Sequence, residues 1–184
     1  ALLYLPFVTA LRAHQFGDEI RRTQVEAQHH RGSARAQYDA GRALAGHPDA
    51  ARIDAPAYAF ARAHFERAGE LDPGFKPGWL GLIYLNCRAG LPAERTWLDE
   101  LSRRLQATAF GPGDSTFLLS LKEMSISGTL CLDRKDVERL FASALANLCN
   151  CSACPTSCAA FSGEPSASRH KLSVISEASS ACLS

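Results

Sequence analysis

Four cysteines near the end of the chain form a cluster whose spacing could hold a metal ion. They are Cys149, Cys151, Cys154 and Cys158. Thiolates at such spacing can ligate zinc or an iron–sulfur cluster, and Cys151 and Cys154 could cycle as a dithiol. However, no histidine lies close by, and the surrounding Ser-rich sequence lacks the periodicity of a scaffold that a metal would organise. We therefore expect neither a metal site nor a cofactor in this chain.

The remaining residues that could carry chemistry are scattered along the chain. The adjacent His29 and His30 could bind a metal weakly, but a solvated surface explains this pair more simply. The sequence contains no P-loop, no dinucleotide-binding glycine motif, no nucleophile elbow and no zinc-protease motif. The net charge of +1 gives no electrostatic reason to expect a nucleic acid partner. The sequence therefore predicts that this chain is not an enzyme.

Helical periodicity accounts for most of the chain up to Asn147. Apolar residues recur every three or four positions, for example at Trp97, Leu98, Leu101 and Leu105. This spacing is typical of the buried stripe of an amphipathic helix. No run alternates apolar and polar residues long enough to predict a strand. We expect an all-α fold with helices over 12–30, 34–45, 57–71, 79–89, 93–107, 116–127 and 133–146.

Capping and turn residues separate these expected helices. Ser33 and Asp133 each stand just before a helix, where a side-chain oxygen can accept a hydrogen bond from the first turn. A Gly- and Pro-rich run predicts a break before Asp114 and Ser115, either of which can cap the helix that follows. Gly41 lies inside an expected helix, where glycine costs about 1 kcal/mol relative to alanine. This cost suggests that Gly41 sits where two backbones come close.

The stretch from Ala61 to Leu82 carries a family resemblance. Two small residues flank a large one at helical spacing, a proline ends the helix, and a tryptophan and a leucine open the next helix. These residues are Ala61, Phe65, Ala68, Pro73, Trp79 and Leu82. The pattern resembles the tetratricopeptide (TPR) repeat, which spans about 34 residues. The resemblance covers roughly residues 33–107, although Ile83 and Asn86 depart from the Gly and the aromatic residue of the motif.

The TPR resemblance implies an architecture and a binding role. It implies a short α-solenoid of antiparallel helical hairpins over residues 33–147, in which the first helix of each hairpin lines a groove for a protein or peptide. By that analogy the ligand-groove candidates are Arg35, Tyr38, Arg42, Lys76, Tyr84 and Asn86. Arginine and asparagine in a groove would suit an acidic ligand or a C-terminal carboxylate. The implied function is a scaffold for protein–protein interaction.

The two ends of the chain differ from the helical middle. Residues 1–11 form an apolar run that is too short to span a membrane alone, because a spanning helix needs about 20 residues. We expect this run to be the last part of a transmembrane helix; a signal-peptide core and a buried first helix are the alternatives. Residues 12–32 are expected to form an amphipathic connector helix.

Over residues 148–184 charge and periodicity stop, so we interpret this Ser- and Cys-rich tail as disordered or non-native, as from a shifted reading frame. Natural low complexity is the alternative.

The order of these parts supports a wider resemblance. An apolar end, an amphipathic connector and TPR-like hairpins are similar to the C-terminal part of bacterial polytopic membrane proteins with a TPR tail. Some of these are related to O-antigen ligases and protein O-glycosyltransferases. The resemblance implies a location at the bacterial inner membrane, with the soluble part facing the periplasm. It also supplies the alternative function, the acceptor-binding region of a membrane glycan ligase or glycosyltransferase.

Two cysteines, Cys87 and Cys131, lie outside the C-terminal tail. We expect them to be small buried groups in the packing between helices. In the periplasm, by contrast, the cysteines of the terminal cluster would tend to oxidise in pairs.

Overall fold

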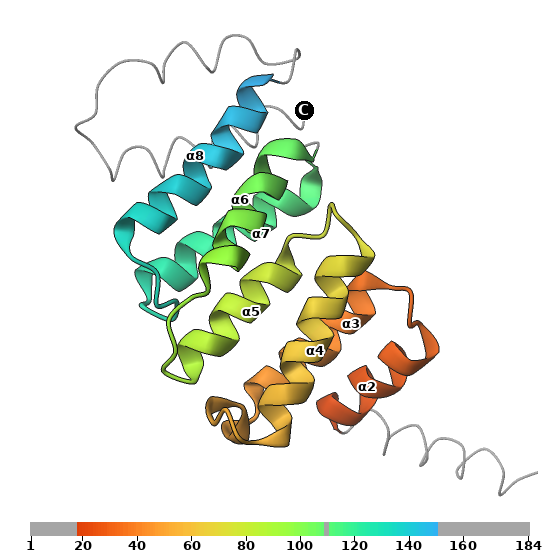
Figure 1. Cartoon of the computed structure of the whole chain (residues 1–184). Helices are drawn as coiled ribbons and strands as arrows, with labels where there is room; N and C mark the ends of the chain where they lie inside the picture. The colour runs from red at the N-terminus through yellow and green to blue at the C-terminus, as the bar shows by residue number, and fades with distance from the viewer. Residues whose placement is uncertain (1–17, 109–110, 151–184) are drawn as a thin grey trace, which may run out of the picture. The chain divides into compact units, whose positions relative to one another are not determined.

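The computed structural model describes residues 18–108 and 111–150, and the regular elements in this part of the chain are all helical (Figure 1). They are α2 (Glu19–His29), α3 (Ala34–Gly46), the 3-10 helix η1 (Pro48–Ala51), α4 (Pro56–Leu71), α5 (Pro77–Arg88), α6 (Arg95–Ala107), α7 (Pro112–Ile126) and α8 (Arg134–Asn150). The expectation of an all-α fold is confirmed. The apolar run 1–11, the first part of the expected connector helix (12–17) and the tail from 151 on lie outside the described residues. Residues 148–150, which were expected to begin the tail, are instead the last three residues of α8. Within residues 18–108 and 111–150, no helix has the length and the apolar content that crossing a membrane requires.

The observed helix ends differ from the expected ones chiefly where proline is present. Pro56, Pro77 and Pro112 each begin a helix, whereas the sequence analysis assigned them to the preceding linkers. Proline suits the first helical position because the N–H that it lacks would have no partner inside the helix anyway. The loop after α3, which was expected to be irregular, contains η1.

Two of the expected helix caps are present. Ser33 Oγ accepts a hydrogen bond from the Ala36 amide at 3.2 Å, and Asp133 Oδ1 accepts one from the Asp136 amide at 2.7 Å. The expectation that Asp114 caps α7 from outside is wrong, because α7 begins earlier, at Pro112. Asp114 is instead the third residue of α7, and its Oδ2 accepts a hydrogen bond from the Gly111 amide at 2.9 Å. This carboxylate therefore stabilises the helix start from inside the first turn.

The described residues divide into two compact units, residues 18–90 and residues 91–150 without 109 and 110. In the first unit, α2, α3, α4 and α5 pack as successive neighbours. Tyr58 near the start of α4 meets Asn86 near the end of α5, whereas Gly69 near the end of α4 meets Trp79 near the start of α5, so these two helices are antiparallel. The helices α2 and α3 are antiparallel as well, because the start of α2 meets Arg42 late in α3 and the end of α2 meets Gln37 early in α3. The first unit is therefore a stack of helical hairpins joined by short connections.

Phe65 is the central side chain of the first unit. The residue is 1% exposed, and the Cδ1–Cε1 edge of its ring packs on two glycines, Gly41 of α3 and Gly81 of α5. A Cβ atom on Gly41 would lie 2.8 Å from Phe65 Cδ1, and one on Gly81 would lie 2.6 Å from the same atom. Gly41 therefore does mark a close approach, but to an aromatic ring and not to a second backbone.

The backbones of α4 and α5 come close at a different glycine. A Cβ atom on Gly78 would lie 2.9 Å from both the carbonyl oxygen of Phe65 and the amide nitrogen of Gly69. Beside this point the indole of Trp79 packs directly on Gly69. Trp79 is half-buried, so it belongs to the α4–α5 packing and is not in open solvent.

In the second unit, α6 and α8 pack with a polar seam between them. Asp99 pairs with Arg139 at 2.8 Å, Ser102 Oγ lies 2.7 Å from Ser143 Oγ, and Asn147 Nδ2 donates to the Leu105 carbonyl at 2.8 Å. The partner numbers rise together along both helices, so α6 and α8 run parallel. This arrangement places equivalent helices of successive hairpins side by side.

One ion cluster on α6 has a strongly shifted carboxyl group. Arg103 donates two hydrogen bonds to Glu100, each of 2.7 Å, and the nearly buried Arg104 donates a third at 2.6 Å. Chiefly because of the Arg103 hydrogen bonds, the pKa of Glu100 is lowered to about 2. Glu100 is therefore ionised throughout the ordinary pH range and stabilises the charge of Arg104.

The two described cysteines do not match the expectation of buried thiols. Both Cys87 and Cys131 are disulfide-bonded. Cys87 is half-buried in the last turn of α5, and Cys131 is exposed in the connection between α7 and α8. Cys131 cannot be part of helix packing because α7 ends at Ile126 and α8 begins only at Arg134.

Candidate functional site

Three of the six groove candidates lie together on one helix. Arg35, Tyr38 and Arg42 are separated by three and four residues on α3, so they follow one face of this helix. The Arg35 side chain is 75% exposed and that of Arg42 is 53% exposed, while Tyr38 is half-buried. We call this strip, together with the intervening Asp39, the α3 surface.

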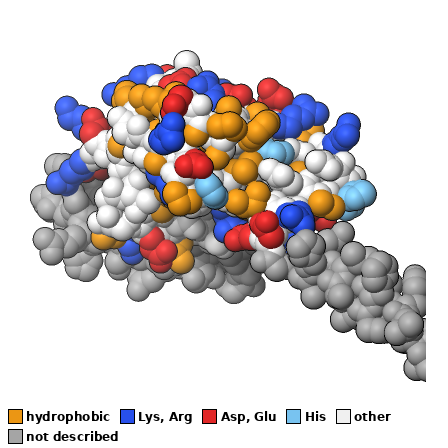
Figure 2. All heavy atoms as spheres, turned by 90° about the horizontal axis from the view of Figure 1, so that it is seen from below, with side chains coloured by type: hydrophobic (Ala, Val, Ile, Leu, Met, Phe, Trp, Pro, Cys, Tyr) orange, Lys and Arg blue, Asp and Glu red, His pale blue; other side chains and the backbone are white. Residues whose placement is uncertain are grey.

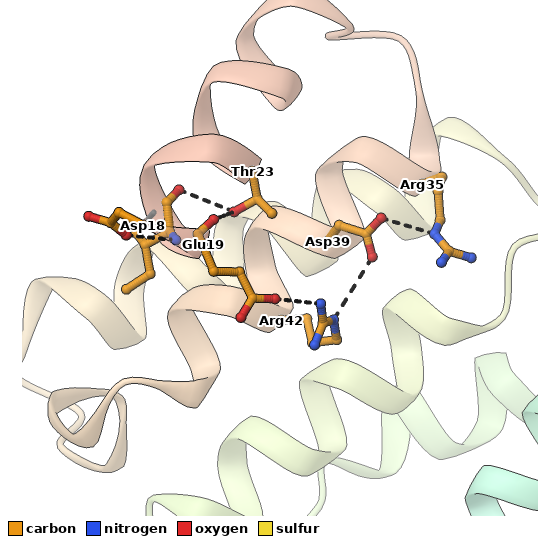
Figure 3. A network of polar contacts seen from close by, with 7 residues as sticks. Asp18, Glu19, Thr23, Arg35, Asp39 and Arg42 are labelled. Carbon is orange, nitrogen blue, oxygen red and sulfur yellow. Dashed lines mark hydrogen bonds and ion pairs between the residues drawn. The ribbon is translucent and has the colours of Figure 1, made fainter. Parts of the chain in front are cut away.

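The guanidinium groups of the α3 surface are paired with carboxylates (Figure 3). Arg35 Nε donates to Asp39 Oδ2 at 3.0 Å, and Arg42 Nη2 donates to Glu19 Oε1 of α2 at 2.7 Å. Asp39 Oδ1 also lies 3.9 Å from Arg42 Nε. Cations and anions therefore alternate across the surface. The sequence analysis missed both carboxylates, although the four-residue spacing of Arg35 and Asp39 could have indicated one of the pairs.

Tyr38 anchors the α3 surface to the core. Its ring centroid lies 5.7 Å from that of Phe65 and 5.6 Å from that of Phe75, and the second contact is edge-to-face. Such aromatic pairs hold a ring in a defined orientation. Burial raises the pKa of the Tyr38 hydroxyl above its ordinary value, against a smaller opposing effect of Arg42. Tyr38 therefore stays protonated and can donate or accept a hydrogen bond.

The other three groove candidates do not join this surface. Lys76 and Asn86 are only 2% and 3% exposed. Asn86 Oδ1 accepts a hydrogen bond from the Tyr58 hydroxyl at 2.6 Å, which ties α5 to α4. Tyr84 is half-buried, and its hydroxyl lies 3.4 Å from Arg88 Nη1. The expectation that Lys76 and Asn86 line an exposed groove thus disagrees with their burial, and Asn86 is held by a partner on a neighbouring helix.

Arg88 is a structural arginine that the sequence analysis overlooked. It stands at the end of α5 and donates hydrogen bonds to the carbonyl oxygens of Ala45, Gly46 and His47. These carbonyls belong to the C-terminal end of α3, where the last backbone acceptors of a helix have no partner within it. A cation there also interacts favourably with the helix dipole. Arg88 therefore fixes the end of α3 against α5.

A buried amide connects three helices beneath the α3 surface. Gln37 Nε2 donates to the Ala27 carbonyl of α2 at 3.1 Å, and Gln37 Oε1 lies 2.8 Å from His64 Nδ1 of α4. Since the amide oxygen is an acceptor, His64 must carry its proton on Nδ1. Burial lowers the pKa of His64, so the neutral imidazole is favoured. This network positions α3 against α2 and α4.

Charged groups of both signs are mixed on the face that Figure 2 shows. On the face shown in Figure 2, Lys and Arg side chains are interspersed with Asp and Glu and with apolar side chains, and neither sign of charge forms a continuous patch. Among the side chains that the structure describes, no group of three or more His, Cys, Asp or Glu could hold a metal ion. The terminal cysteine cluster lies outside those described side chains.

Comparison of the chain with known protein families, with characterised proteins and with solved structures finds no match.

Proposed function

We propose that this chain is a TPR-like scaffold for protein–protein interaction, and that its α3 surface binds an acidic peptide segment. The observation that carries the proposal is the exposed pair Arg35 and Arg42 on either side of an oriented tyrosine, Tyr38, on a single helix face. Arginine is well suited to this role because its planar guanidinium can donate two parallel hydrogen bonds to one carboxylate. No catalysis is part of the proposal.

The repeat geometry within each unit supports the scaffold half of the proposal. In the first unit α3 begins at Ala34 and α5 at Pro77, 43 residues later. In the second unit α6 begins at Arg95 and α8 at Arg134, 39 residues later. In both cases the equivalent helices run parallel. These periods exceed the TPR period of about 34 residues, but they fall in the range of helical-hairpin repeats in general.

The spacing of the two arginines sets the form of the ligand. Seven residues along a helix rise by about 10 Å, at about 1.5 Å per residue. An extended peptide covers that distance in about three residues. A segment with a C-terminal carboxylate and an acidic side chain about three residues earlier would thus reach both guanidinium groups. Arg35 is the second residue of α3, where the positive end of the helix dipole adds to the attraction for an anion.

The existing ion pairs are weak competitors for such a ligand. Exposed pairs contribute only about 0–1 kcal/mol because water screens them. Arg35, Arg42 and Glu19 are all more than half exposed. A peptide that binds both arginines and the Tyr38 hydroxyl would therefore replace weak ion pairs by a larger number of hydrogen bonds.

The proposed location is the periplasmic side of a bacterial inner membrane. The disulfide-bonded state of Cys87 and Cys131 favours an oxidising compartment over the cytoplasm. Membrane attachment is proposed through the apolar run 1–11, on the sequence pattern alone. Thiol labelling of the protein purified without reductant would test the oxidised state of these two cysteines.

Fluorescence anisotropy with a labelled pentapeptide tests the binding proposal. The peptide carries a glutamate three residues before a free C-terminal glutamate, and the control peptide has glutamines at both places and an amidated end. We expect the combined Arg35→Ala and Arg42→Ala change to weaken binding of the acidic peptide about tenfold, because charge-assisted hydrogen bonds are lost.

The matched control variant is Arg67→Ala. Arg67 is also 53% exposed and is paired with a carboxylate on its own helix, Glu70, at 3.3 Å, but it lies on α4. This variant should bind the acidic peptide as the unchanged protein does. Equal binding of the two peptides, or an equal loss in Arg67→Ala, would show that the α3 surface is not the site.

A further inference from the structure

The closest anion to Arg42 comes from a different helix. Glu19 is the first residue of α2 and precedes Arg42 by 23 residues, yet its Oε1 lies 2.7 Å from Arg42 Nη2 (Figure 3). Asp39, one turn from Arg42 on α3 itself, is farther from that guanidinium, at 3.9 Å. The α2 helix therefore supplies the main counter-charge of Arg42.

Glu19 occupies one of the donors that a ligand carboxylate would use. A carboxylate binds arginine best through two parallel hydrogen bonds. Arg42 Nη2 already donates to Glu19, so a carboxylate that binds along the Nε and Nη2 edge of the guanidinium competes with this contact. The exchange is possible because both side chains are 53% exposed and water can reach them.

The rest of α2 remains attached when Glu19 leaves. Thr23 and Ala27 are buried, and the Ala27 carbonyl accepts a hydrogen bond from Gln37 of α3. The first turn of α2 also has a cap of its own, since Asp18 Oδ1 accepts hydrogen bonds from the amides of Ile20 and Arg21. Release of Glu19 therefore frees one side chain and does not unfold the helix.

We infer that Glu19 is an internal competitor for the acidic ligand at Arg42, so that the connector helix α2 tunes the affinity of the α3 surface. This inference rests on the proposed function. The two contacts of Arg42 then affect each other reciprocally. A stronger Glu19–Arg42 contact weakens ligand binding, and a bound ligand weakens the Glu19–Arg42 contact by the same factor.

The variant Glu19→Gln tests the competition. Glutamine keeps the size of the side chain but removes the charge that holds Arg42. We expect the acidic pentapeptide to bind Glu19→Gln about two- to fivefold more tightly, a range typical of removing one exposed ion pair. The control is Glu26→Gln on the same helix, which removes an equal charge from an exposed side chain whose partner is His30. It should change the affinity less than Glu19→Gln does.

A second pair of variants separates direct competition from general electrostatics. In the Arg42→Ala background, Glu19→Gln should have no further effect, because the competed group is absent. Circular dichroism of each variant confirms that the helices are retained.

The possible outcomes distinguish the inference from the proposed function. If the unchanged protein binds the acidic peptide through the arginines but Glu19→Gln and Glu26→Gln act alike, the competition is overturned and the binding proposal stands. If the acidic peptide binds measurably to Glu19→Gln but not to the unchanged protein, both the inference and the proposed function are supported. If neither the unchanged protein nor Glu19→Gln binds the acidic peptide, both are overturned.

Discussion

Replacing Gly81 by alanine should destabilise the first unit, and this loss should vanish when Phe65 is shortened. The Cβ atom of an alanine at position 81 would lie 2.6 Å from both Cδ1 and Cε1 of Phe65 and 2.9 Å from Cζ. Carbon atoms in favourable contact are about 3.5–4.0 Å apart. Gly41 of α3 approaches the same Cδ1–Cε1 edge, since a Cβ atom there would lie 2.8 and 2.9 Å from these two atoms, so two helices confine this edge of the ring.

Two opposing contributions set the expected magnitude. Inserting a methyl group into a packed core costs about 1–3 kcal/mol. Replacing glycine by alanine inside a helix contributes about 0.5–1 kcal/mol of stability. The net free energy of unfolding should therefore fall by about 1–2 kcal/mol for Gly81→Ala. In a Phe65→Val background the Cδ, Cε and Cζ atoms are gone, so the same substitution should be neutral or stabilising by up to about 1 kcal/mol.

Urea denaturation followed by far-UV circular dichroism measures the free energy of unfolding of four proteins: the unchanged protein, Gly81→Ala, Phe65→Val and the double variant. Hydrogen exchange of peptides from α4 and α5 then assigns the change to the first unit. The matched control is Gly46→Ala at the end of α3, where an added Cβ would meet no atom within 4 Å. Its effect should stay within about 0.5 kcal/mol.

The double-mutant comparison gives the refuting result. If Gly81→Ala changes the stability by the same amount with Phe65 and with valine at position 65, within about 0.5 kcal/mol, the two sites do not interact. The inferred close packing of the Phe65 ring on Gly81 would then be wrong. A stabilising effect of Gly81→Ala in the unchanged protein would refute it as well.

Three further predictions concern polar groups. Burial lowers the pKa of His64 below 6.5, so as the pH falls the unfolded chain binds a proton on this imidazole before the folded chain does. The free energy of unfolding that depends on neutral His64 is therefore complete above pH 6.5 and decreases as the pH falls toward the lowered pKa. In denaturation measured between pH 7.5 and pH 5, the stability of His64→Gln should depend less on pH than that of the unchanged protein. Hydrogen bonds, chiefly from Arg103, lower the pKa of Glu100 to about 2. The contribution of ionised Glu100 to the free energy of unfolding is therefore complete above pH 4.5 and is lost as the pH falls toward 2. Acid denaturation of Glu100→Gln should lack this loss of stability between pH 4.5 and pH 2. Asn86→Ala removes the acceptor of the buried Tyr58 hydroxyl and should lower the thermal stability by about 1–3 kcal/mol, and a Tyr58→Phe change in that background should recover part of it.

The sequence predicted most helices because their signals are local. Apolar spacing identified α3 to α8, and the caps Ser33 and Asp133 act on amides only three residues away. The errors at Pro112 and Asp114 arose from treating proline only as a helix breaker, although its fixed φ also suits the first helical turn.

The candidate site could be predicted only in part. Helical spacing alone places Arg35, Tyr38 and Arg42 on one face of α3. It could not show that Asn86 is buried, because this depends on the hydroxyl of Tyr58, 28 residues away. Nor could it show that Arg42 is paired with Glu19, because that contact exists only after α2 folds back on α3.

By itself, then, the amino-acid sequence determined the helical class of the protein, the positions of its helices and the absence of a recognised catalytic motif. These properties follow from backbone geometry and from patterns within a few residues. Only the tertiary structure decided which polar side chains face solvent, which arginines are paired with distant carboxylates, and why glycine stands at positions 41 and 81. Those properties depend on atoms that are distant along the chain and are brought within van der Waals or hydrogen-bond contact by the packing of helices.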